Sequence, residues 1–388
     1  MAGYAFMRDT AQSGRDGKEP LLNRRQYVTA AGGAVAAVLG IGPAAAGSNR
    51  GAGSNSVTVS TTDETSSSGD STTAATDSEG PAVGGGESYG ETIAPSEATV
   101  VVETRAALNQ ALQAAQQGDV VYLAGGADIE MGRSEFSIPS GVTLASNRGI
   151  DGAPGGRLST DAHPWGMLIA NEDVRISGLR VGGPRWEWIG NVDGELGIDV
   201  AGANVEIDNC EVYGWGYAAI RTEDDTHVHH CEIHHNPKDG TGYGVSTGSS
   251  TNPIIEYNVF HHNRHSVASS SNGYTARYNY VGKGAISHVF DQHTPGGSTI
   301  KIHHNTVAVV DHSTKDKNAP AVAIRGTPSD VADIHHNWFY NPKEPRSNPS
   351  GWTDEAIIQV HVDEWENVDY HNNHYGSDDP GTDIGHPR

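Results

Sequence analysis

Ile300-Lys301-Ile302-His303-His304-Asn305 is the stretch that decides the fold, because degenerate copies of it recur along the chain. Each copy is a short alternating strand that runs into a bend, where Asn is the commonest residue. The nine bend positions are Asn147, Leu179, Cys210, Cys231, Asn258, Asn279, Asn305, Asn337 and Asn373, spaced 21 to 36 residues apart. Self-similarity at such spacing is typical of solenoids. We therefore predict stacked coils of a parallel β-helix, each built from three short strands.

Each coil carries a second alternating strand with an apolar residue that would point inward. These residues are Ile198, Ile220, Val245, Val267, Val322 and Ile357. Asn suits the bend because it tolerates left-handed backbone geometry and because stacked amides bond along the solenoid axis. Cys210 and Cys231 share the bend column on neighbouring coils, about 4.8 Å apart. They form either a reduced, buried ladder or a disulfide.

A short helix is expected at the start of the folded part. Thr104 is its predicted cap, and its apolar stripe comprises Leu108, Ala111, Leu112 and Ala115. Gly118 is expected to end the helix, and residues 119–123 form the first strand. A solenoid needs such a cap because its open end would expose core and unpaired strand edges.

The N-terminus has the order of charge, apolar run and cleavage site that is typical of an export signal. Arg24-Arg25 precedes an apolar, Ala/Gly-rich run that lacks acidic residues and reaches Ala44-Ala45-Ala46. We predict a twin-arginine signal peptide over residues 1–46; the alternative is an accidental Arg pair before a buried helix. Residues 47–96 are rich in Ser, Thr, Gly and acidic residues, which predicts a disordered linker. The chain is therefore expected to be secreted or held at the cell surface.

The charge balance excludes two classes of partner. The formal net charge is −23, from 48 acidic and 25 basic residues. Such a surface repels nucleic acid and anionic membranes, and no membrane span is expected once the signal is removed. An acidic, lysine-poor exterior is typical of a halophilic protein, since concentrated salt screens its self-repulsion. An ordinary acidic secreted protein is the alternative.

Residues from about 99 to 375 resemble the right-handed parallel β-helix superfamily of pectate lyases, alginate lyases and alginate C5-epimerases. The helix and the strand at 119–123 resemble the N-terminal cap and first strand of those proteins. The resemblance implies an all-β fold: a single-stranded right-handed parallel β-helix over residues 97–388 with a short N-terminal capping helix. It also implies an acidic polysaccharide as partner and calcium as a cofactor. We expect a monomer.

Residues 261–293 are dense in reactive side chains, and strand register decides which way they face. Phe290 should point inward, because the opposite register would bury Asp291 unpaired at a cost of several kcal/mol. Two outward columns then follow. One is Asp199, Arg221, Ser246, Ala268, Asp291 and Ala323; the other is Ala201, Glu223, Gly248, Ser270, His293 and Arg325. His265 should stack beside His288. In a third column, counted from the bend, lie His235, His262 and Lys283.

These columns would gather His, Asp, Arg and Lys on one surface, the groups needed to attack an acidic sugar. A cation neutralises the C6 carboxylate, and a base takes the C5 proton. Loss of the C4 oxygen then gives a lyase; return of a proton to the other face gives an epimerase.

Phe290-Asp291-Gln292-His293 resembles the Asp-Pro-His core of alginate C5-epimerases and related lyases, with Gln292 at the Pro position and His288 at a Tyr position. The resemblance implies His293 as base, Asp291 as its orienter or as a substrate contact, and His288 as proton donor. Candidates to neutralise the carboxylate are Arg325, Arg264 and Lys283, and His265 lies beside them in the predicted catalytic group. The predicted substrate-binding residues are Arg221, His262, Trp186 and Trp188, although the two tryptophans would equally cover core. Asp224 and Asp225 are the candidate calcium ligands, with a solvated acidic turn as the alternative.

Two other functions stay open from the sequence. A glycoside hydrolase on the same fold needs paired carboxylates, whereas residues 261–293 offer a single one, Asp291. A non-catalytic surface protein for adhesion or glycan binding needs none of this chemistry. The His pairs before other bends, as at 303–304 and 335–336, are predicted to be turn residues of the repeat.

Overall fold

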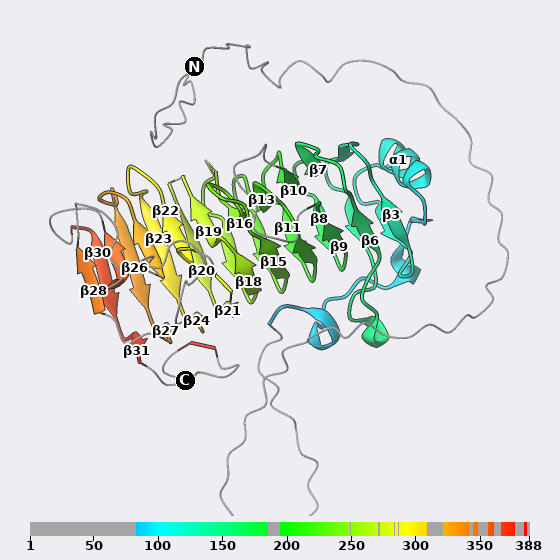
Figure 1. Cartoon of the computed structure of the whole chain (residues 1–388). Coiled ribbons are helices and arrows are strands. Elements are labelled where there is room, and N and C mark those ends of the chain that lie inside the picture. Colours follow the sequence, from blue (N-terminus) through cyan, green and yellow to red (C-terminus); the bar gives the residue numbers. More distant parts are fainter. Residues whose placement is uncertain are drawn as a thin grey trace, which may run out of the picture. The chain divides into compact units, whose positions relative to one another are not determined.

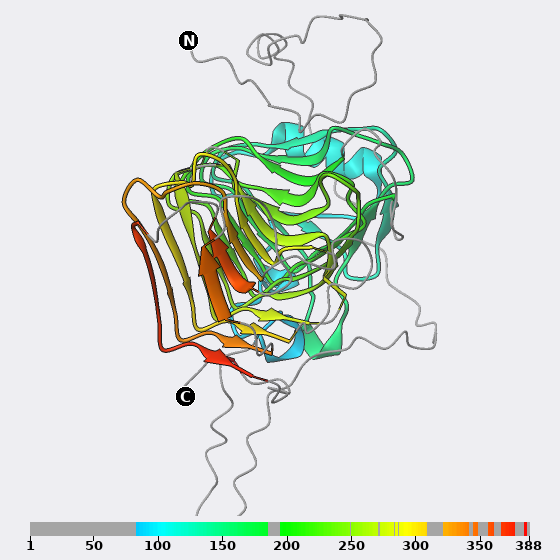
Figure 2. The ribbon, with the colours of Figure 1, turned by 60° about the vertical axis from the view of Figure 1, so that its left-hand side comes forward.

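The computed structural model describes residues 83–184, 195–248, 250–270, 272–282, 284–285, 287–308, 321–340, 344–347, 356–360, 366–376 and 384–385. The chain winds through three parallel sheets in turn, so that each coil adds one strand to each sheet (Figure 1). Figure 2 shows the sheets as separate walls around a common interior. The architecture is the predicted all-β, right-handed parallel β-helix.

The first sheet contains β1 (Val100–Val102), β2 (Val120–Leu123), β5 (Thr143–Ala145), β8 (Arg175–Ser177), β11 (Glu206–Asp208), β14 (His227–His229), β17 (Ile254–Glu256), β20 (Gly273–Arg277), β23 (Thr299–His303), β26 (Val331–His335) and β30 (Val368–His371). The second sheet contains β3 (Asp128–Glu130), β6 (Arg157–Ser159), β9 (Arg180–Gly182), β12 (Glu211–Tyr213), β15 (Glu232–Asn236), β18 (Val259–Asn263), β21 (Tyr280–Val281), β24 (Thr306–Val307), β27 (Trp338–Phe339) and β31 (His374–Tyr375). The third sheet contains β4 (Phe136–Ile138), β7 (Gly166–Ala170), β10 (Leu196–Val200), β13 (Ala218–Arg221), β16 (Tyr243–Ser246), β19 (His265–Ser269), β22 (Phe290–Gln292), β25 (Val322–Ile324), β29 (Ala356–Val360) and β28 (Glu344–Ser347).

The register of the third sheet places the predicted apolar column inside. Ile198, Ile220, Val245, Val267, Phe290 and Val322 lie opposite one another on successive strands and are fully buried. Ile357 was assigned to this column wrongly, because Val322 pairs with Ile358. Two apolar residues are adjacent at this point, so a period of two cannot choose between them.

The bend column forms the predicted ladder of side-chain amides. The side-chain oxygen of Asn305 accepts hydrogen bonds from the backbone and side-chain amides of Asn279, at 3.0 and 2.9 Å. The same pattern continues through Asn337 to Asn373. Cys210 and Cys231 occupy the column as free, buried thiols, and the Cys210 amide lies 3.4 Å from the Cys231 sulfur. Burial raises the pKa of the Cys231 thiol, which keeps it protonated.

The N-terminal cap is built as predicted at its start. Helix α1 spans Arg105–Ala114, and the Thr104 hydroxyl accepts the Ala107 amide proton at 3.2 Å. The helix ends at Ala114, earlier than expected, and Gly118 instead adopts a left-handed conformation before β2. Strand β1, which sequence reasoning missed, precedes the helix and pairs with β2.

Residues 83–96 belong to the solenoid, which corrects the predicted linker boundary. Val83, Tyr89 and Ile93 are buried. The Tyr89 hydroxyl donates to Asp208 at 2.9 Å, and the Gly84 amide donates to the Tyr257 carbonyl at 2.8 Å. These three apolar residues are separated by Gly, Ser and other polar residues, so the composition of the segment did not predict that it is ordered. The predicted signal peptide and residues 47–82 lie outside the described residues.

Candidate active site

The candidate site lies on the outer face of the third sheet, where β19, β22 and β25 are neighbours. Asp291 on β22 pairs with Ala268 on β19 and Ala323 on β25. Because Phe290 points inward, Asp291 points outward, as the register argument predicts. Asp291 is nevertheless fully buried, because its neighbours cover it.

Asp291 is the centre of a hydrogen-bonded cluster of cationic and imidazole groups. Arg325 donates to both carboxylate oxygens, from Nε to Oδ1 at 3.2 Å and from Nη2 to Oδ2 at 2.7 Å. His293 Nε2 lies 3.1 Å from Oδ2. Burial raises the pKa of the Asp291 carboxyl, but the neighbouring His288, His293 and Arg325 together hold it well below its usual value. The side chain is therefore a carboxylate near neutral pH.

The contacts of His293 fix its tautomer. A carboxylate only accepts hydrogen bonds, so His293 Nε2 carries the proton that Asp291 receives. When the ring is neutral, Nδ1 has a lone pair, to which the Ser270 hydroxyl, 3.2 Å away, donates. The His293 side chain is 26% exposed. Asp291 thus orients a partly exposed imidazole whose other nitrogen lies beside a serine hydroxyl.

His265 and His288 form a supporting layer behind this imidazole. His265 is fully buried. Its Nδ1 donates to the His288 carbonyl at 2.7 Å, and its Nε2 accepts from Arg264 Nη1 at 2.6 Å. Burial and the adjacent Arg264 lower its pKa well below the usual value, so it stays neutral. The His288 ring stacks on His265 at 5.2 Å, as predicted, and is 4% exposed.

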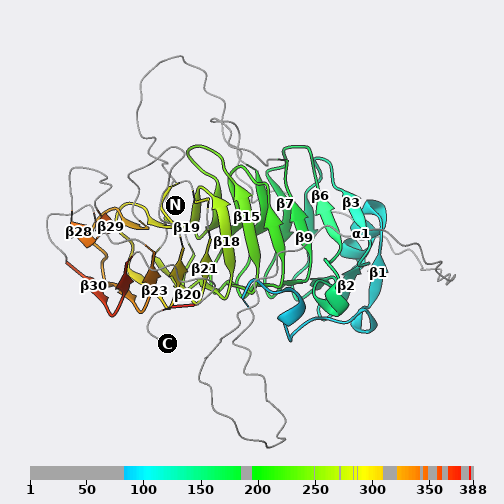
Figure 3. The ribbon, with the colours of Figure 1, turned by 60° about the horizontal axis from the view of Figure 1, so that its bottom comes forward.

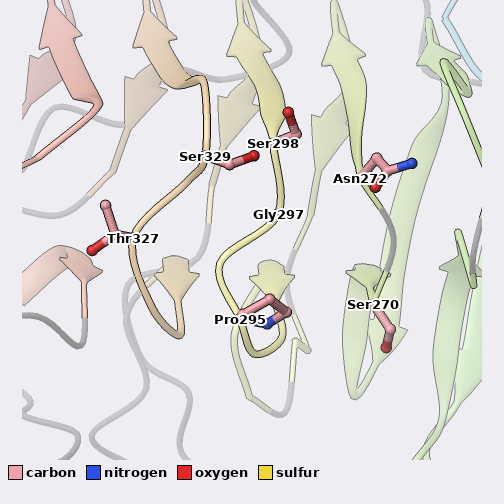
Figure 4. A pocket seen from close by; sticks show the side chains of 7 residues that line it. All are labelled: Ser270, Asn272, Pro295, Gly297, Ser298, Thr327 and Ser329. Carbon is pink, nitrogen blue, oxygen red and sulfur yellow. The ribbon is translucent and has the colours of Figure 1, made fainter.

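A polar pocket adjoins the cluster at the loops that lead from the third sheet to the first. Its volume is about 470 Å³, and small or polar residues of three successive coils line it: Ser270, Asn272, Pro295, Gly297, Ser298, Thr327 and Ser329. Figure 4 shows these residues on neighbouring loops, with the Ser270 hydroxyl at one side. Ser270 connects the two features, because it lines this pocket and its hydroxyl lies 3.2 Å from His293 Nδ1.

Local charge at the cluster differs in sign from that of the whole chain. Asp291 contributes one negative charge, while Arg325 and Arg264 contribute two positive charges around a neutral His265. The chain as a whole carries a formal charge of −23. An excess of positive charge in such a protein favours an anionic ligand at this place.

The structure separates some predicted residues from the cluster. Arg221 forms an ion pair with the fully buried Asp199 at 2.5 Å, and this pair lies in the same outward column three coils away from Asp291. His262 stacks on His235 at 4.5 Å, as the predicted third column requires, at the end of β18 in the second sheet. Lys283, the other predicted member of that column, lies outside the described residues, as do Trp186 and Trp188.

Asp224 and Asp225 serve as acceptors within a turn. Asp224 accepts the Thr251 amide at 2.7 Å, and Asp225, in a left-handed conformation, accepts the Asn252 side-chain amide at 3.4 Å. Calcium requires six to eight oxygen ligands, whereas these carboxylates are engaged with the next coil. The geometry fits the alternative of a solvated acidic turn.

Sequence reasoning missed the aromatic residues beside the cluster. Tyr243 on β16 stacks on His265 at 5.5 Å and meets the His293 ring edge-on at 6.3 Å. Tyr217 packs against Tyr243, and the half-exposed Trp165 packs against Tyr217. These residues lie at or just before the starts of strands, where the repeat does not predict which way a side chain points. They form an aromatic row that leads along the third sheet toward the site.

Comparisons with known proteins agree with the fold. A family model described as "Right handed beta helix region" matches residues 171–343. Among solved structures, the chain is similar to an alginate lyase from Paenibacillus sp. str. FPU-7, with a TM-score of 0.51 and 15% identity over 71% of this chain and 94% of that chain. No curated protein matches the sequence. In the described residues no helix is both long and apolar enough to cross a bilayer.

Proposed function

We propose that the protein is a polysaccharide lyase that removes the C5 proton of uronic-acid residues. The observation that carries the proposal is the orientation of His293, whose Nε2 is held by Asp291 and whose Nδ1 faces Ser270 and the pocket side. An oriented, neutral imidazole is the commonest general base at neutral pH. The excess positive charge at the cluster suits a sugar carboxylate, and the similar alginate lyase acts on an acidic polysaccharide of this class.

In the proposed reaction Arg325 faces the C6 carboxylate and makes the C5–H bond more acidic. His293 Nδ1 takes the C5 proton as the Ser270 hydroxyl turns away. The electrons of the C5–H bond form the C4–C5 double bond, and the C4–oxygen bond breaks. The leaving C4 oxygen receives a proton from the imidazolium, directly or through Ser270. Asp291 stabilises the imidazolium throughout, because its carboxylate remains charged.

The position of His288 favours a supporting role over the proton-donor role that the resemblance implied. Its ring is almost fully buried and stacks behind His265, so a substrate at the surface would meet His293 first. An epimerase would need a second proton carrier on the opposite face of the sugar. The reaction proposed above uses His293 for both proton transfers, which suits the lyase.

A glycoside hydrolase fits the cluster less well. Its general acid is a carboxyl group with a raised pKa. Among the residues described at this cluster, Asp291 is the carboxylate, and its pKa is held well below the usual value. It cannot supply a proton to a leaving group.

The test is a lyase assay at high salt with pectate, alginate and glycosaminoglycans, following the absorbance of the unsaturated product. Loss of a general base costs about 10²- to 10⁴-fold in rate, so His293→Ala should lower the rate by at least about 100-fold. His336→Ala, which removes an imidazole from a turn of the first sheet, should leave the rate unchanged. The extracellular export predicted for residues 1–46 would bring the enzyme to a substrate too large to enter a cell.

The same assay separates the other functions. New reducing ends without the absorbance would identify a hydrolase, and inversion at C5 seen by NMR without cleavage would identify an epimerase. Binding with no product from any of the three polymers would show a glycan-binding protein. An equal loss of rate in both variants would remove His293 from the mechanism.

A further inference from the structure

Four histidines form a cluster where β15 and β18 end, in the second sheet. His234 stacks on His261 at 4.6 Å with the rings 5° from parallel, and His235 stacks on His262 at 4.5 Å. Figure 3 shows the two strands side by side in the sheet. We call His234, His235, His261 and His262 the four-histidine cluster. The proposed lyase mechanism uses none of these side chains.

Glycines border the cluster on the coils before and after it. Gly214 lies on the coil before His235, and Gly284 lies on the coil after His262. Both glycines have left-handed backbone conformations. A Cβ atom added at Gly284 would lie 2.4 Å from the His262 ring. The His262 ring therefore packs closely against the Gly284 backbone, an approach that a residue with a side chain would prevent.

Two glutamates set the tautomers of the inner histidines. Glu211 lies 3.1 Å from His234 Nε2, and Glu232 lies 3.2 Å from His261 Nε2. A carboxylate accepts, so both Nε2 atoms carry protons, and in the neutral rings both Nδ1 atoms have lone pairs. A carboxylate on the second ring nitrogen is the usual support of a metal-binding histidine, because it fixes the ring and makes the other nitrogen more basic.

The nitrogen atoms are close enough to share one cation. His234 Nδ1 lies 2.7 Å from His235 Nδ1, and His261 Nδ1 lies 2.9 Å from His262 Nδ1. One ligand atom each from His234, His235 and His261 fall within 4.8 Å of one another. Zn–N bonds of about 2.0–2.1 Å in tetrahedral geometry separate ligand nitrogens by roughly 3.4 Å. To reach that spacing, the paired nitrogens of His234 and His235 would separate by about 0.7 Å, and the nitrogens furthest apart would approach by up to about 1.4 Å.

We propose that the four-histidine cluster binds a divalent transition-metal ion of the zinc class. His234, His235 and His261 supply three imidazole nitrogens, and His262 or water completes the shell. All-nitrogen sites of this kind suit Zn²⁺, Ni²⁺ and Cu²⁺, whereas Ca²⁺ and Mg²⁺ prefer oxygen. The ion would tie two coils together immediately before β19, the strand that carries His265.

The chain contains a matched comparison. His303, His304, His335 and His336 repeat the arrangement in the first sheet, with Nδ1 separations of 2.9 and 2.7 Å and ring stacks at 4.8 and 4.9 Å. There the carboxylate nearest to His335 Nε2, on Asp333, is 3.7 Å away, beyond hydrogen-bond distance. Without that support the second set should bind a metal ion more weakly.

The experiment is a calorimetric titration of the untagged, chelator-treated full chain with zinc chloride at pH 7. The test variant is His235→Asn/His262→Asn, and the control variant is His304→Asn/His336→Asn. All four positions have left-handed backbone conformations, which Asn tolerates well, so both variants should fold. We expect one zinc ion per chain, an affinity at least 10-fold weaker in the test variant, and an unchanged affinity in the control.

Absence of zinc binding by the wild type would overturn the proposal. Equal weakening in the two variants would overturn it too, because it would show that any pair of bend histidines serves equally. Neither result depends on whether the chain cleaves a polysaccharide.

Discussion

Two buried ion pairs on the outer face of the third sheet allow function to be separated from stability. Asp291 pairs with Arg325, and Asp199 pairs with Arg221; each carboxylate is fully buried, and each arginine side chain is 27% exposed. Asp291 also contacts His293 at 3.1 Å and His265 at 3.4 Å. We predict that Asp291→Asn and Asp199→Asn destabilise the fold similarly, whereas Asp291→Asn alone abolishes the lyase activity.

The expected magnitude follows from the burial. Removing one partner of a buried pair costs about 3–5 kcal/mol, because the other charge loses its compensation. The arginines keep some contact with water, so the lower end, about 3 kcal/mol, applies. Unfolding entropy of ~2.1 cal/mol/K per residue over roughly 300 residues converts this loss into a fall in Tm of about 5 °C. The rate should fall at least ~100-fold in Asp291→Asn, since a neutral amide no longer stabilises the imidazolium.

The assay pairs thermal unfolding, followed by circular dichroism, with the lyase rate measured 15–20 °C below the lower Tm. A Tm that falls by about 5 °C in both variants, with activity lost only in Asp291→Asn, is the expected result. If Asp199→Asn lost as much activity as Asp291→Asn, the loss would come from the damaged solenoid. If Asp291→Asn retained full activity, the carboxylate would have no part in the reaction.

Two further predictions concern the fold itself. Asn305→Ala should lower the free energy of unfolding by about 3 kcal/mol, because it leaves buried ladder amides without partners; Asn109→Ala, on the exposed face of α1, should change it little in the same denaturant titration. Acid should destabilise the protein between pH 6.5 and about 4. The folded state holds the pKa of His265 well below its usual value and that of His303 at about 4, so only the unfolded chain takes up protons there. The Tm at pH 5 should be below that at pH 7, and a flat profile would contradict this.

The fold was largely readable from the sequence because one physical requirement repeats on every coil. Every coil needs a residue at the bend whose side-chain amide can bond to the next coil, so Asn recurs there. The alternation of apolar and polar residues in the strands of the third sheet assigns Phe290 to the interior. The outward column through Asp291 follows from that register alone. Where the local pattern was ambiguous, at Ile357-Ile358, the register was off by one residue.

The site was only partly readable, because its key contacts are made between coils of different length. Asp291 and His293 are two residues apart in sequence, so their contact could be foreseen. The Ser270 hydroxyl on His293 and the bidentate Arg325 depend on how the loops from the third sheet end. Tyr243 and the histidine tautomers depend on side-chain packing, about which a repeat pattern says nothing.

The same repeat explains why the histidines divide into roles that composition cannot distinguish. Bend histidines pair through Nδ1 on several coils, which is a structural feature of the repeat. What changes from coil to coil is the group that faces the other ring nitrogen. In the metal site that we propose, a glutamate supports a bend histidine. In the active site that we propose, Asp291 on Nε2 of His293 orients a surface imidazole as the base. In both proposals the role of a histidine depends on the carboxylate that the register of the sheets brings to it.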